Sequence, residues 1–93
     1  MDQTRIKTIE TGRALESLLI SPGWDIVQDI LKSYEQGAVS DILDYKGSDM
    51  NVLRSKQMSA RIVKETRNLL NQHINDAIQA ARNVLMEEVK NND

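Results

Sequence analysis

The stretch LLISPGWDIVQDIL, residues 18–31, places a proline and a glycine between two apolar patterns of helical spacing. Proline disfavours the α conformation of the residue before it, so a first helix must end by Ile20. Ser21 then suits the N-cap of a second helix, and Pro22 suits its first position, where the missing N–H costs nothing. The stretch therefore predicts a joint between two helices.

Two further signals divide the rest of the chain. Apolar residues recur at steps of three and four from Trp24 to Tyr45, and the segment YKGSDMN follows. In that segment Gly47 suits the position after a helix, and Ser48 or Asp49 suits the N-cap of the next one. Residues 50–90 contain no Gly or Pro, which predicts one long helix.

Together these signals predict an all-α fold in a single domain spanning residues 1–93. We expect helices at about 4–20, 22–45 and 50–90. The short connection at residues 46–49 predicts an antiparallel helical hairpin with a long C-terminal helix. The additional N-terminal helix joins it at a Ser-Pro-Gly kink.

The third helix carries more apolar surface than the second can cover. Helix 22–45 is long enough to cover only the first half of the third helix, so residues 74–89 form an uncovered overhang. Either the first helix continues past the kink and covers this overhang, or it folds back and the overhang pairs with another copy of the chain. We expect a protein partner or a homo-oligomer. The predicted interface comprises Trp24, Ile74, Ile78, Ala81 and Leu85. Trp24 has a second interpretation, as a plug between the helices at the joint.

The residues that carry chemistry are few and scattered. The chain has no cysteine, which excludes thiolate metal sites. His73 is the single histidine and therefore the only imidazole that could act as the base for a catalytic serine. The four glycines lack the spacing of a phosphate-binding loop. The acidic pairs Asp25–Asp29 and Asp41–Asp44 suit helix ends and solvated faces better than a catalytic cleft. We therefore expect no enzyme, no cofactor, no metal and no small-molecule substrate.

The charge is unevenly distributed, although the net charge is only −2. Residues 1–49 carry five basic and nine acidic side chains, whereas residues 50–70 carry five basic ones against Glu65 alone. Arg54, Arg61 and Lys64 share one helix face and could contact phosphates, which makes a small nucleic-acid-binding regulator or packaging factor the alternative function. The pI of about 5.3 and the lack of aromatic residues within this block count against it.

The chain also lacks membrane signals. No apolar run approaches the ~18 residues that cross a bilayer, and the first ten residues, MDQTRIKTIE, do not form a signal peptide. We expect a protein of the cytoplasm that does not contact a membrane.

The segment LLISPGWDIVQDILKSY, followed by VLRSKQMSARIVKETRNLL, resembles a pattern in small helical proteins of tailed bacteriophages over about residues 18–70. This resemblance implies a non-enzymatic accessory or structural component that acts by helix–helix contact, in the cytoplasm of a bacterial host or in the virion. A phage inhibitor of a host protein is a further alternative, since the acidic faces of the first two helices would suit a basic target.

Overall fold

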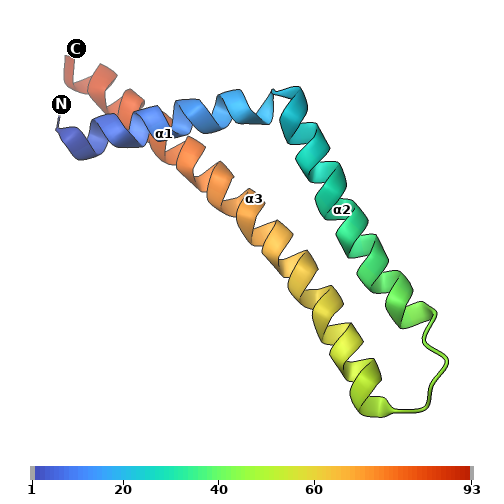
Figure 1. The fold of residues 1–93 in the computed structure, drawn as a ribbon. Helices are drawn as coiled ribbons and strands as arrows, with labels where there is room; N and C mark the ends of the chain where they lie inside the picture. The colour runs from blue at the N-terminus through green and yellow to red at the C-terminus, as the bar shows by residue number, and fades with distance from the viewer. Residues whose placement is uncertain (1, 93) are drawn as a thin grey trace. The chain divides into compact units, whose positions relative to one another are not determined.

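The computed structural model describes residues 2–92 and shows an all-α fold of three helices in that part of the chain (Figure 1). They are α1 (Gln3–Leu19), α2 (Pro22–Leu43) and α3 (Met50–Asn92). All six boundaries fall within two residues of the predicted ones. The helical hairpin formed by α2 and the first half of α3, and the long C-terminal helix, are as the sequence predicts.

The joint between α1 and α2 is capped as expected. The Ser21 hydroxyl accepts a hydrogen bond from the backbone N–H of Trp24 at 3.3 Å and donates one to the carbonyl of Leu18 at 2.7 Å. One side chain therefore satisfies an orphan donor at the start of α2 and an orphan acceptor at the end of α1. Pro22 occupies the first position of α2, where its missing N–H leaves no bond unmade.

The connection between α2 and α3 is closed by side chains. The Asp49 carboxylate caps α3, accepting from the N–H of Asn51 at 2.9 Å. The Tyr45 hydroxyl accepts from the N–H of Asp49 at 3.1 Å and donates to the Asp49 carbonyl at 3.2 Å. The prediction for Gly47 is wrong: α2 ends at Leu43, four residues earlier, and Gly47 has no positive φ. The last carbonyls of α2 accept backbone hydrogen bonds instead, Ser40 from the Asp44 N–H at 2.8 Å and Ile42 from the Tyr45 N–H at 3.3 Å.

Contacts divide the chain into two compact units. Unit 1 comprises Met1–Asp25 and Leu70–Asp93, and unit 2 comprises Ile26–Leu69. The helix α3 belongs to both, with its first half in unit 2 and its second half in unit 1. The sequence predicts one domain over residues 1–93, and the folding of the two units as a single domain stays a prediction.

Unit 1 holds nearly all of the buried apolar residues. Its α1 runs antiparallel to the second half of α3, because Arg5 contacts Glu87 and Glu88 while Glu16 contacts Arg82. The buried residues of the unit are Ile9 and Gly12 in α1 and Ile74, Ile78 and Ala81 in α3, with Gly12 directly against Ala81. The first helix thus covers the overhang of α3, which is the first of the two arrangements that the helix lengths allow.

The interior of unit 2 is much smaller. No residue of α2 is buried, and in α3 only Ala60 is buried within this unit. A hairpin of two helices gains most of its stability from packing an apolar face, not from helix propensity. In unit 2, by contrast, most of the large apolar side chains remain exposed.

Candidate functional site

The seam between the two helices of unit 2 follows a seven-residue repeat. Its partly buried positions alternate at steps of three and four: Leu31, Glu35, Ala38 and Ile42 in α2, and Leu53, Lys56, Ala60, Val63 and Arg67 in α3. This is the spacing that keeps two helices in contact along one side. The seam leaves two flanks on each helix, and in an antiparallel pair the corresponding flanks of both helices lie on the same side of the hairpin.

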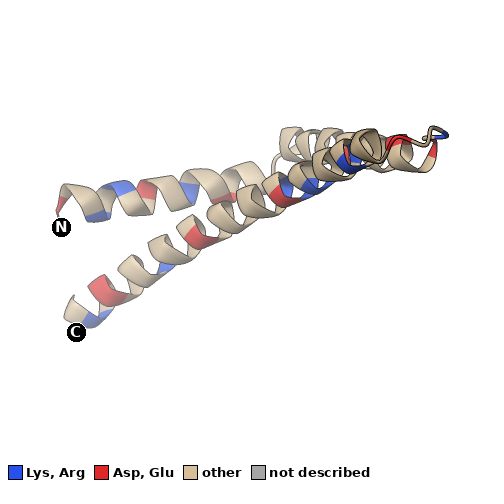
Figure 2. Ribbon diagram, turned by 90° about the horizontal axis from the view of Figure 1, so that it is seen from below, with Lys and Arg blue, Asp and Glu red and all other residues tan. Residues whose placement is uncertain are grey.

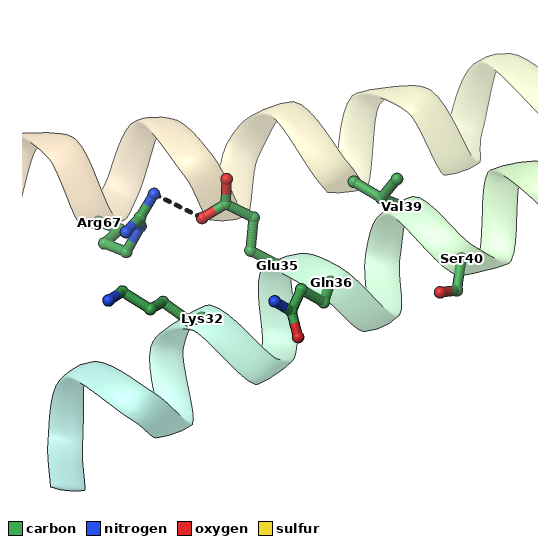
Figure 3. Close-up of a pocket in the computed structure, with 6 residues that line it drawn as sticks. All are labelled: Lys32, Glu35, Gln36, Val39, Ser40 and Arg67. Atoms are coloured by element: carbon green, nitrogen blue, oxygen red, sulfur yellow. Dashed lines mark ion pairs between the residues drawn. The ribbon is translucent and has the colours of Figure 1, made fainter.

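An ion pair occupies the seam beside apolar residues. Arg67 and Glu35 approach to 2.8 Å, and their side chains are only 21% and 20% exposed. Figure 3 shows the pair bridging the two helices above a shallow hollow that Lys32, Gln36 and Val39 border. The Nε of Arg67 is buried without a hydrogen-bond partner. A polar pair at such a position sets the register of two helices at some cost in stability.

One flank of unit 2 is apolar. From α2, Ile30 and Tyr34 lie beside the seam, and from α3, Ile62 and Leu69 lie beside it on the same side. We call this surface the apolar flank; its large side chains are 39–68% exposed and comprise Val27, Ile30, Tyr34, Val52, Ile62 and Leu69. The α3 positions between them hold Ser55, Ser59 and Thr66. The flank residues named here include no Asp, Glu, Lys or Arg.

The opposite flank of unit 2 is basic. Arg54, Arg61 and Lys64, the predicted phosphate contacts, are exposed there, and Lys32 of α2 lies on the same side. Figure 2 shows Lys and Arg recurring along this part of α3. Arg61 also lies 3.9 Å from Glu65 in the same helix. The two other cations of the block are engaged in the hairpin itself, Arg67 with Glu35 and Lys56 over the Tyr45 ring at 5.9 Å.

The predicted partner interface lies in a different place. Ile74, Ile78 and Ala81 are only 4–7% exposed, because α1 of the same chain covers them in unit 1. Leu85 and Trp24 are half-buried. A second protein could reach the three buried residues only if unit 1 opened, so the surface available for docking is not the one that the overhang suggests.

Helical spacing of apolar residues does not by itself separate the residues of the apolar flank from those of the seam. The available signal was the adjacent apolar pairs Ile30–Leu31 and Ile62–Val63. Neighbouring residues on a helix point about 100° apart, so both members of a pair cannot enter one narrow seam. Leu31 and Val63 enter it, and their neighbours form the flank.

No group of three or more His, Cys, Asp or Glu in residues 2–92 is arranged to hold a metal ion, and His73 is exposed on α3. None of the helices in this range is long and apolar enough to cross a membrane.

Comparison with protein-family models, with curated proteins and with solved structures gives no match.

Proposed function

We propose that this protein is a non-enzymatic interaction or assembly component that acts through helix–helix contact. The observation that carries the proposal is the contrast within unit 2. The hairpin buries one alanine, Ala60, while Ile30, Tyr34 and Ile62 on its apolar flank are each about half exposed or more. Contiguous exposed apolar surface rimmed by polar residues is typical of a protein-binding site.

The energetic reason concerns what unit 2 gains by being covered. Burial of apolar surface contributes about 25 cal/mol per Å², and the ordering of each residue costs about 1.5 kcal/mol. A hairpin with so small an interior gains little from its own packing to offset that cost. A partner that lies on the apolar flank supplies the missing burial, so docking and stabilisation of the hairpin are coupled.

The biological setting of the proposal rests on the resemblance of residues 18–70 to small tailed-phage proteins. This range contains all of unit 2, which carries the apolar flank. We place the protein among virion-associated or assembly accessory components of a phage. An inhibitor that docks on a host protein would use the same surface and the same physical principle.

Site-specific photo-crosslinking in bacterial cells that produce the full chain tests the proposal. A photoreactive amino acid is placed at Tyr34 on the apolar flank or, as the control, at Gln36 on the opposite side of the same helix. We expect protein adducts of discrete mass at position 34 and far fewer at position 36. Equal labelling at both positions, or no adduct at position 34, would contradict the proposal.

A further inference from the structure

We infer that the apolar flank of unit 2 binds the apolar flank of a second copy of this chain, in a symmetric dimer. The inference rests on the proposed function and names the partner. It can fail while the proposed function stands, because another apolar helix could occupy the same flank.

The chemistry of the flank restricts its partner. On α3 the row Val52, Ser55, Ser59, Ile62, Thr66 and Leu69 contains no charged residue over 18 positions. On α2, Ile30, Tyr34 and Gly37 continue this uncharged surface as far as Asp41, which lies one turn beyond Gly37. A nucleic acid or a strongly charged peptide finds no counter-charge there, whereas an equally uncharged helical surface does fit. A second copy of the chain carries that surface and is always present.

The area of the flank matches what a dimer needs. A side chain of this size that is about half exposed presents roughly 80–100 Å², so the six large residues present on the order of 500 Å². Each partner in a standard interface contributes about 800 Å², of which about 57% is apolar, or about 450 Å². The apolar flank thus supplies the apolar part of one such interface.

The small residues of the flank allow close approach. Ser59 and Thr66 separate the large side chains on α3, and Gly37 on α2 leaves open space, with nothing within 4 Å of an added Cβ. Alternation of large and small residues lets two such surfaces interdigitate. The two pairs of helices would then form a four-helix bundle whose interior comprises both apolar flanks.

Charge selects the orientation of the two copies. Within unit 2, residues 26–43 of α2 carry three acids and one base, a net charge of −2, whereas residues 50–69 of α3 carry five bases and one acid, a net charge of +4. A two-fold axis parallel to the helices stacks α2 of one copy on α3 of the other. The cations of α3 lie in the seam or on the opposite flank, so net charge favours this axis by keeping the two positive α3 helices apart. Rotation about such an axis leaves every residue at the same height along the helices. Because Glu35 pairs with Arg67, it also brings Tyr34 beside Leu69 of the partner subunit.

The mass of the full chain in solution tests the dimer. Sedimentation equilibrium from about 1 to 200 μM is expected to show a rise from 10.6 kDa to twice that value. Ile30→Asp places a charge on the flank and is expected to weaken association at least tenfold. Val39→Asp is the matched control, since Val39 is 45% exposed against 49% for Ile30 and lies nine positions away on the opposite side of α2.

Two results would overturn the dimer. One is a wild-type mass that stays at that of a single chain throughout the range. The other is equal dissociation by both variants while circular dichroism shows both to be helical. If Ile30→Asp loses its helix, Ile62→Ser replaces it as the milder flank variant. Adducts at position 34 with a different protein, together with a monomeric mass, would support the proposed function and overturn the second copy as the partner.

Introduced thiols test the orientation, because the natural chain has no cysteine. A Tyr34→Cys chain is mixed with a Leu69→Cys chain and oxidised. We expect mixed disulfides between the two variants to exceed the disulfides that either variant forms with itself. Predominance of the Tyr34→Cys homodimer would show α2 stacked on α2 and would overturn the orientation.

Discussion

Gly12 of α1 lies directly against the methyl group of Ala81 in α3, and a Cβ on Gly12 would overlap that methyl group. The carbonyl oxygen of Ala77 would lie 3.3 Å from the same Cβ. The two backbones of unit 1 therefore approach as closely as they do because one residue has no side chain. In the sequence Gly12 only weakens a helix, by about 1 kcal/mol relative to alanine; in the structure it permits the contact that covers Ala81.

Gly12→Ala is expected to destabilise the protein although alanine favours helix. Overpacking costs about 1–3 kcal/mol, which offsets or exceeds the gain of about 1 kcal/mol in helix propensity. Urea unfolding followed by the fluorescence of Trp24, the single tryptophan, measures the change. The control is Gly37→Ala at low micromolar concentration, where the apolar flank is least covered; an added Cβ meets nothing within 4 Å, and a gain of up to about 1 kcal/mol is expected. A gain at both positions would show that α1 and α3 separate readily.

The buried part of unit 1 is expected to respond to Ile78→Ala. Ile78 is 6% exposed, whereas Ile62 on the apolar flank is 54% exposed. Loss of a buried isoleucine costs about 2–5 kcal/mol, so Ile78→Ala should lower the midpoint of unfolding much more than Ile62→Ala does. The comparison is made at low micromolar concentration, where the flank is least covered. A larger loss at Ile62 would place the main core of the chain in unit 2.

The Arg67–Glu35 pair is expected to be strongly coupled. Arg67→Leu leaves a carboxylate that is only 20% exposed without its partner, at an expected cost of about 1–3 kcal/mol. The double variant Glu35→Leu/Arg67→Leu should recover most of that loss, since two leucines at seam positions pack against each other. A double-mutant cycle in urea measures the coupling. The exposed pair Arg61–Glu65 is the control and should show at most a few tenths of a kcal/mol.

The basic flank is expected to bind nucleic acid only weakly. Four exposed cations, Lys32, Arg54, Arg61 and Lys64, would give a slope of about −3.6 in a plot of log K against log salt concentration if each contacted a phosphate. Fluorescence anisotropy with a labelled DNA duplex should therefore show release by about 150 mM salt. Tight binding at that concentration, abolished by charge reversal of Arg54, Arg61 and Lys64, would favour the alternative function of a nucleic-acid-binding factor.

The helices and their ends follow from the sequence because the signals that set them are local. Ser21 and Pro22 satisfy or remove backbone donors within one turn, and Asp49 does the same at the start of α3. The hairpin follows as well, since a connection of six residues between two helices leaves them antiparallel neighbours. The end of α2 does not follow from the glycine pattern, because the N–H groups of Asp44 and Tyr45 bond to α2 carbonyls without a glycine of positive φ.

Which apolar residues enter the interior could be decided only by tertiary structure. Ile30 and Leu31 are equally apolar, and the sequence cannot choose between them; the contact with α3 places Leu31 in the seam and leaves Ile30 outside. In the same way, the sequence shows that Ile74 and Ile78 are apolar. It does not show that α1 of the same chain covers them. Hydrophobicity sets how much surface must be buried, whereas the pairing of helices decides which surface remains for a partner.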